Sequence, residues 1–131
     1  MLSRRELKQI ARARLKDAEV LLRAKRFDGA SYLCGYAVEV ALKAKICETL
    51  NRKGFPSTNS EFKNYQSFKT HSLDVLLTFS GVEDKIKKRY LAEWSVVAEW
   101  DPEARYKPAG KVGEGDSELM IESTKTLMAA L

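Results

Sequence analysis

The sequence has little cysteine and histidine, and this scarcity excludes several kinds of site. Only two cysteines and one histidine occur in 131 residues. Cys34 and Cys47 lie 13 positions apart in one expected helix, so they are separated by about 20 Å and cannot pair within it. A zinc site needs four ligands, which two distant cysteines and His71 do not supply. We therefore expect no metal or other cofactor, and buried free thiols typical of a reducing cytoplasm.

Long apolar runs are also missing from the sequence. No stretch approaches the roughly 20 apolar residues that span a bilayer. The N-terminal MLSRRELKQIARARLK is basic but lacks the apolar core of a signal peptide. No segment alternates apolar and polar residues over a useful length, so no sheet is expected. These absences predict a cytoplasmic protein without a membrane span, organised as one domain over residues 1–131.

Apolar residues instead recur at helical spacing through most of the chain. In residues 3–25, leucine or alanine occupies positions 7, 11, 15, 18 and 22, which form one helical stripe. Similar patterns predict further helices over 29–53, 72–80, 82–100 and 116–131, with loops at 54–70 and 101–115. The sequence therefore predicts an all-α fold, an up-and-down helical bundle of four longer helices plus one short helix.

Several residues are expected to shape the ends and contacts of these helices. Ser3 and Glu6 are spaced for a capping box, and Asp28 and either Asp116 or Ser117 are candidate caps for two later helices. Gly54, followed by Pro56, is expected to end the helix over 29–53. Within that helix, the small residues Gly35 and Ala41 would let a neighbouring helix approach closely. The loop at 54–70 is rich in aromatic residues, which predicts that it folds back on the bundle or meets a partner.

Positive charge is concentrated in the first helix. Residues 1–26 hold nine basic and three acidic residues, a net +6, whereas the rest of the chain, with 14 basic and 15 acidic, has −1. A basic helix can follow nucleic-acid phosphates, and the candidates for contacting RNA phosphates are Arg4, Arg5, Lys8 and Arg12. The alternative is an ordinary solvated helix face.

No familiar catalytic motif is present, but one helical face carries polar chemistry. Tyr36, Glu39 and Lys43 are spaced by three and four residues and so share a face. Glu39 and Lys43 could hold a ligand or a partner's arginine. The alternative is an intrahelical ion pair, worth about 0.3–0.5 kcal/mol if exposed.

Two further candidates lie after the long loops. His71 precedes the short helix, where backbone N–H groups favour an anion; its alternative role is a hydrogen bond to a backbone carbonyl or to Glu39. Arg105 and Tyr106 follow a Trp-Asp-Pro corner, and an arginine there can bind phosphate or carboxylate or bridge to an acidic residue. Because a partly buried carboxylate needs a partner, we expect Glu39, His71 and Arg105 to converge at one end of the bundle.

The order of these short motifs resembles a known family. They are Phe27-Asp28-Gly29-Ala30, Ala37-Val38-Glu39-Val40-Ala41-Leu42-Lys43-Ala44, His71-Ser72-Leu73 and Arg105-Tyr106. This set is similar to the HEPN domain, the helical module named for higher eukaryotes and prokaryotes nucleotide-binding. The resemblance implies a helical bundle that often forms a homodimer. Many prokaryotic members are encoded beside a small nucleotidyltransferase, in some cases as toxin–antitoxin pairs, and other members are metal-independent ribonucleases.

The chain departs from the ribonuclease members at two points. Those members carry an arginine followed four to six residues later by a histidine, whereas no histidine follows Arg105. The usual His-Asp-Leu is His-Ser-Leu here, with Ser72 in place of the acid. The sequence therefore favours a non-catalytic homodimeric module that binds a nucleotide and pairs with a separately encoded minimal nucleotidyltransferase. The alternative is a metal-independent ribonuclease toxin that uses Arg105 and His71, with RNA held by the first helix.

Overall fold

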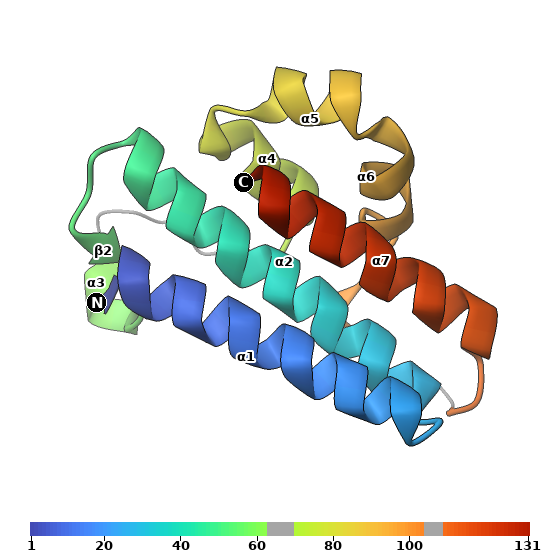
Figure 1. Ribbon diagram of the computed structural model, residues 1–131. Helices are drawn as coiled ribbons and strands as arrows, with labels where there is room; N and C mark the ends of the chain where they lie inside the picture. Colours follow the sequence, from blue (N-terminus) through green and yellow to red (C-terminus); the bar gives the residue numbers. More distant parts are fainter. Residues whose placement is uncertain (63–69, 104–108) are drawn as a thin grey trace.

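The computed structural model describes residues 1–62, 70–103 and 109–131, and these residues form an all-α bundle (Figure 1). Its long helices are α1 (Arg4–Arg23), α2 (Phe27–Thr49) and α7 (Glu114–Ala130). Shorter helices are α3 (Asn59–Phe62), α4 (Leu73–Ser80), α5 (Glu83–Arg89) and α6 (Leu91–Val97). The predicted all-α class is confirmed, whereas the described residues form three long and four shorter helices in place of the predicted four longer helices and one short helix. No described helix has both the length and the apolar composition that a membrane span requires.

The central element of the fold is α2, because it packs against α1, α4 and α7. Its sequence is rich in alanine and small residues, and Ala30, Ala37 and Ala44 are all buried. Cys34 and Cys47 are also buried and free on this helix, as expected. Burial on several sides explains why the helix contributes so many residues to the core and shows little amphipathic contrast.

The order and directions of the helices define the bundle. A short connection makes α1 and α2 antiparallel neighbours, whereas α7 runs in the same direction as α2 (Figure 1). Side-chain positions agree, since Ser117 at the start of α7 donates to the carbonyl of Phe27 at the start of α2. The intervening short helices carry the chain back to that end of the bundle before α7 begins.

The predicted helix over 82–100 is divided in the structure. Its apolar stripe is retained, with Ile86, Trp94 and Val97 buried. At Tyr90, however, the backbone leaves helical geometry, with φ −131° and ψ 32°, and the chain turns sharply from α5 into α6 (Figure 1). An apolar stripe indicates which residues are buried. Because a bend at the half-buried Tyr90 leaves the same residues buried, the stripe does not reveal the bend.

The long loop predicted at 54–70 contains ordered elements. The strand β1 (Leu2–Ser3) pairs antiparallel with β2 (Gly54–Phe55), a two-residue exception to the expected absence of sheet. Helix α2 ends at Thr49, five residues before the expected stop at Gly54. Gly54 serves the strand pairing instead, because a Cβ there would lie 2.4 Å from the carbonyl oxygen of Leu2.

The expected caps are only partly correct. Ser3 and Glu6 form the predicted capping box of α1. Helices α2 and α7 begin without a side-chain cap, so the predicted capping roles of Asp28, Asp116 and Ser117 are wrong. Asp28 is instead engaged in a tertiary contact described below.

Candidate functional site

The candidate site is built around Glu39, a buried carboxylate in the middle of α2. Its side chain is only 3% exposed. An ionised carboxylate withdrawn from water is costly unless charged groups or hydrogen-bond donors surround it. The structure supplies such donors from two different segments of the chain.

The donors are Lys43 and His71, one for each carboxylate oxygen. Lys43 Nζ lies 3.0 Å from Oε2 of Glu39, one helical turn away on α2. His71 Nδ1 lies 3.0 Å from Oε1, and His71 comes just before α4. The structure therefore brings together Glu39, Lys43 and His71, which we call the Glu39 cluster.

The cluster determines that Nδ1 of the histidine ring is protonated. A carboxylate only accepts hydrogen bonds, so Nδ1 of His71 carries the proton that it donates to Glu39. In the neutral ring Nε2 is then an acceptor, and in the charged ring it is a donor. Because the side chain is 65% exposed, Nε2 is the polar atom through which the cluster can meet a ligand.

Lys43 is held inside the cluster. Its side chain is 15% exposed, and its ammonium lies 5.2 Å from the ring centroid of the buried Phe55, a cation–π distance. Tyr36, on the same face, is half-buried against the core. Among the described residues, no hydrogen bond joins Tyr36 to Glu39 or Lys43, so the structure does not draw it into the cluster.

His71 is positioned by the start of α4. Ser72 is the N-cap of this helix, and its side chain accepts a hydrogen bond from the N–H of Val75 at 3.4 Å. Serine and aspartate are both good N-caps. The serine therefore keeps the capping function that an aspartate at this position would provide, and His71 remains anchored to the first turn of the helix.

Arg105 and Tyr106 lie outside the described residues, and their predicted place beside Glu39 stays a prediction. The segment that follows α6 packs against α2, since the ring of Trp100 lies directly on Gly35, one turn before Glu39. Trp100 Nε1 also donates to the carbonyl of Tyr32 at 3.1 Å.

An open cleft lies beside Trp100, between the start of α2, α6 and α7. Its volume is about 960 Å³, and its described walls include Tyr32, Val96, Trp100, Asp101 and Ala109. Aromatic and apolar surface next to carboxylates makes this cleft suited to a planar organic group.

Asp28 ties the loop before α7 to the start of α2. Its carboxylate accepts the N–H of Gly110 at 2.5 Å and the N–H of Val112 at 3.0 Å. The hydrogen bond from Gly110 and then that from Val112 lower the pKa of the Asp28 carboxyl. Two backbone amides of residues 110–113 are therefore used within the protein, and this segment ties the loop to α2.

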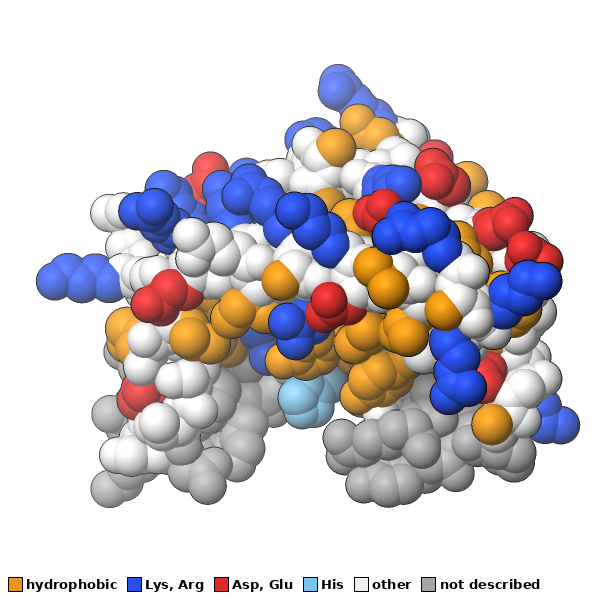
Figure 2. Space-filling model, turned by 60° about the horizontal axis from the view of Figure 1, so that its bottom comes forward, with side chains coloured by type: hydrophobic (Ala, Val, Ile, Leu, Met, Phe, Trp, Pro, Cys, Tyr) orange, Lys and Arg blue, Asp and Glu red, His pale blue; other side chains and the backbone are white. Residues whose placement is uncertain are grey.

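The four predicted RNA-phosphate residues are all exposed on α1. Figure 2 shows lysine and arginine side chains gathered along one side of the molecule. Arg4 and Arg5 lie at the start of the helix, whereas Lys8 and Arg12 border a small hollow between α1, α2 and α7. The structure thus separates these four residues into two groups and places none of them in the Glu39 cluster.

The described residues offer little metal-binding or thiol chemistry. No three histidine, cysteine, aspartate or glutamate side chains come together as a metal site within them. Burial raises the pKa of the Cys34 thiol to about 11, and burial also raises that of Cys47. Both thiols are therefore protonated at neutral pH, and protonated thiols are poor nucleophiles.

Comparison with protein families agrees with the motifs around Glu39. Residues 4–60 match the family model of the HEPN domain. The resemblance to HEPN is therefore confirmed. The HEPN match spans α1, α2 and β2 and so includes Glu39, Lys43 and Phe55, and it ends before His71. No curated protein and no solved structure shows significant similarity to the chain.

Two structural contacts were not predicted from the sequence. The cation–π contact of Lys43 with Phe55 joins a helix to a loop, and no periodic pattern signals such a pairing. Asp28 carried a signal, because its place beside Phe27 and Gly29 belongs to the motif that marks the family, but its partners lie 82 and 84 residues away.

Proposed function

We propose that this chain is a non-catalytic HEPN module that binds a nucleotide and pairs with a separately encoded minimal nucleotidyltransferase. One observation carries the proposal: the chain's single histidine is bound to Glu39 and anchored before α4, far in sequence from Arg105. The family's ribonuclease spacing, an arginine and a histidine within one short segment, is therefore not available.

The Glu39 cluster has the properties of a binding site. Glu39 neutralises most of the positive charge of Lys43, so the exposed His71 ring is the group that can contact a ligand. A charged ring donates Nε2–H to a phosphate, and a neutral ring accepts from a ribose hydroxyl or a base N–H. The cleft with Tyr32 and Trp100, which lies about 10 Å along α2 from Glu39, offers a surface for a planar base.

The nucleotide part of the proposal is tested by calorimetric titration of ATP. We expect His71→Ala to weaken ATP binding by about tenfold or more, because it removes the exposed donor of the cluster. Thr78→Ala on α4 is the matched control, since Thr78 is exposed on the same helix and outside the cluster. Equal affinities of all three proteins, or no ATP binding by the wild type, would contradict this part.

The pairing part is tested by co-expression with the adjacent reading frames. Purification of the tagged chain, followed by mass spectrometry, should recover a small nucleotidyltransferase in constant proportion to it. A chain that purifies alone under these conditions would contradict the pairing. The homodimer is tested separately by light scattering.

The alternative is a metal-independent ribonuclease, and the hydrogen bond between His71 and Glu39 supports it for another reason. A buried carboxylate that fixes Nδ1–H leaves Nε2 as a base, which is the arrangement needed to take a proton from a ribose 2′-hydroxyl. A complete site would also need an acid and a stabilising cation, and Arg105 would have to supply the cation.

We predict no specific cleavage of structured RNA in the presence of EDTA, because the usual arginine–histidine pair is missing. Denaturing gels of the reaction products provide the measurement. Discrete product bands that disappear in His71→Ala but persist in Ser72→Asp, which keeps the helix cap, would establish the ribonuclease instead.

A further inference from the structure

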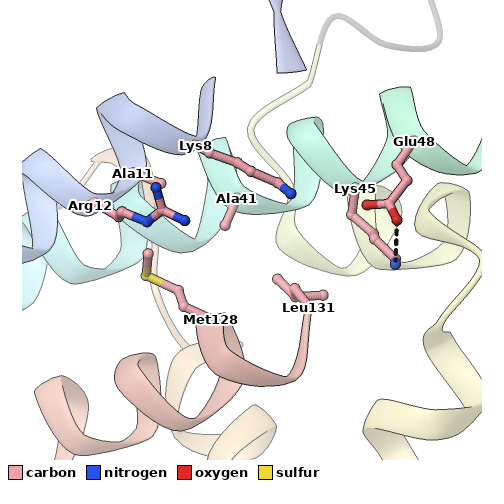
Figure 3. Close-up of a pocket in the computed structure, with 8 residues that line it drawn as sticks. All are labelled: Lys8, Ala11, Arg12, Ala41, Lys45, Glu48, Met128 and Leu131. Atoms are coloured by element: carbon pink, nitrogen blue, oxygen red, sulfur yellow. Dashed lines mark ion pairs between the residues drawn. The ribbon is translucent and has the colours of Figure 1, made fainter. Parts of the chain in front are cut away.

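A second candidate site lies on the opposite side of α2 from the Glu39 cluster. Residues advance by about 100° per position on a helix, so Ala41 and Lys45 face away from Glu39 and Lys43. Here α1, α2 and the end of α7 enclose a hollow of about 130 Å³ (Figure 3). Its lining residues are Lys8, Ala11, Arg12, Ala41, Lys45 and Glu48, with Met128 and Leu131.

The hollow carries an excess of positive charge. Among the described residues that line it, Lys8, Arg12 and Lys45 are the basic side chains and Glu48 is the acidic one. Glu48 Oε1 lies 3.6 Å from Lys45 Nζ, so that pair is internally balanced. Within the described ranges, no acidic group pairs with Lys8 or Arg12. Two cations that share a small hollow repel each other, and a bound anion would remove that repulsion.

The floor of the hollow is small and apolar. Ala11 is buried and Ala41 half-buried, and their short side chains leave the space open between the helices. Met128 and Leu131 border the hollow from the end of α7, and Lys8 and Arg12 reach over it from α1 (Figure 3). Apolar side chains therefore form one wall of the hollow, and the two exposed cations form another.

The geometry points to a phosphate-binding subsite formed by Lys8 and Arg12 beside the Lys45–Glu48 pair, distinct from the Glu39 cluster. Arginine binds two phosphate oxygens with its planar fork, and lysine adds a compact charge. Met128 provides an adaptable apolar surface for the group that the phosphate carries. The phosphate belongs either to a free nucleotide or to an RNA backbone.

The basic residues around the subsite extend the same flank of α1. Arg5, Lys16 and Arg23 lie on this flank at helical spacing from Lys8 and Arg12. They are exposed and do not line the hollow. They therefore serve as matched controls, because their removal changes the net charge by the same amount without changing the hollow.

The test compares two pairs of single substitutions, Arg12→Ala with Arg23→Ala and Lys8→Ala with Lys16→Ala. Binding of inorganic phosphate and AMP is followed by NMR chemical shifts, and binding of fluorescein-labelled octauridylate by anisotropy. We expect Arg12→Ala and Lys8→Ala to weaken binding of the probe by about tenfold. Each control should weaken it by less than about twofold. Thermal unfolding of each variant verifies that the fold is intact.

A steric variant separates the shape of the hollow from its charge. Ala41→Met fills the hollow and leaves every charge in place, so it should weaken phosphate binding as Arg12→Ala does. If Arg12→Ala weakens the binding of AMP more than the binding of octauridylate, the subsite is a nucleotide site. If it weakens the binding of octauridylate more than the binding of AMP, the subsite holds an RNA backbone.

Three results would overturn the subsite. The first is no binding of any probe at roughly 5 mM phosphate or AMP or at saturating protein for the RNA. The second is an equal loss in each variant and its control, which would show a diffuse basic surface. The third is unchanged binding in Ala41→Met. Because His71 lies on the other face of α2, the second and third results would leave the proposed nucleotide site standing, and titration of ATP into His71→Ala tests that site separately.

Discussion

At the scale of single residues, Glu39 organises the chemistry of this protein. It is buried, and both of its oxygens accept a hydrogen bond from a nitrogen, one from Lys43 and one from His71. The three residues differ in exposure, from 3% for the Glu39 side chain to 65% for His71. Glu39 therefore matters for folding and for orienting the histidine, whereas His71 is free to contact other molecules.

We expect Glu39→Gln to lower the free energy of unfolding by about 2 kcal/mol, because it leaves the largely buried ammonium of Lys43 without its counter-charge. Urea unfolding followed by circular dichroism gives the measurement. Combining it with Lys43→Met should restore part of the loss, since replacing both partners of a buried pair costs little.

His71→Ala provides the matching comparison at the exposed end of the cluster. It should cost less than about 1 kcal/mol, because the imidazole is mostly in water and its partner keeps Lys43. If Glu39→Gln were as stable as the wild type, or if His71→Ala were the more damaging change, the cluster would not have the organisation described here.

At the scale of the elements, α2 is the helix that packs against α1, α4 and α7. Gly35 and Ala41 were expected to let a neighbouring helix approach closely, but at Gly35 the close partner is a tryptophan side chain. Gly35 lies under the indole ring of Trp100, from the segment after α6, and a Cβ there would come within 2.1 Å of the ring. Ala41 opens into the hollow between α1, α2 and α7.

Gly35→Ala should therefore destabilise the protein by about 2 kcal/mol or more, because the added methyl group forces Trp100 off α2. Thermal unfolding and the fluorescence of tryptophan report both effects. The control is Gly115→Ala in the first turn of α7, where a Cβ meets nothing within 4 Å. It should remain within about 0.5 kcal/mol of the wild type or gain stability, and equal losses in the two variants would contradict the packing argument.

The tie between α2 and the loop before α7 predicts a dependence on pH. The pKa of Asp28 is lowered in the folded protein by the amides of Gly110 and Val112. A lowered folded pKa gives stability that is fully present above the unfolded value of about 4 and is lost as pH falls through the folded value. In Asp28→Asn one of the two accepting oxygens becomes an NH2 group, which cannot accept a hydrogen bond, so this variant should be less stable than the wild type near neutrality.

Urea unfolding at a series of pH values measures this effect. The gap in stability between wild type and Asp28→Asn should be constant above about pH 5 and should narrow below about pH 4. A gap of the same size throughout the acid range would show that the carboxylate charge is not what holds the loop.

At the scale of the whole molecule, exposed apolar side chains indicate how copies of the chain would assemble. Large hydrophobic side chains remain exposed on two adjoining helices, with Leu91 of α6 at 57% and Leu119 of α7 at 54%. Exposed apolar residues on neighbouring helices suit a contact between copies of the chain. The resemblance to HEPN domains favours the same arrangement.

We therefore predict a homodimer packed through helices. Light scattering at micromolar concentration should give twice the chain mass of 14.8 kDa. Dilution should lower the mass only gradually, as expected for a specific interface. A mass equal to that of one chain at this concentration would exclude the dimer.

Local sequence patterns determined most of the helices. The stripes in 3–25 and 72–80, the capping box at Ser3 and the cap at Ser72 all depend on residues three or four positions apart, and such spacing is visible in the chain itself. The partnership of Glu39 with Lys43 is of this kind. The link from Glu39 to His71 was predicted from chemistry, because a partly buried carboxylate needs a donor.

Only the tertiary structure decided the features that join distant segments. Four such features depend on which surfaces meet in space. They are the turn at Tyr90, the pairing of Gly54 with β1, the packing of Trp100 on Gly35, and the hydrogen bonds of Asp28 to the loop before α7. The hollow beside Lys8 and Arg12 likewise needs three helices at once, and α7 reaches it only because that helix runs parallel to α2. Periodicity fixes which face of a helix is buried, but the partner that covers that face is chosen by packing of the whole chain.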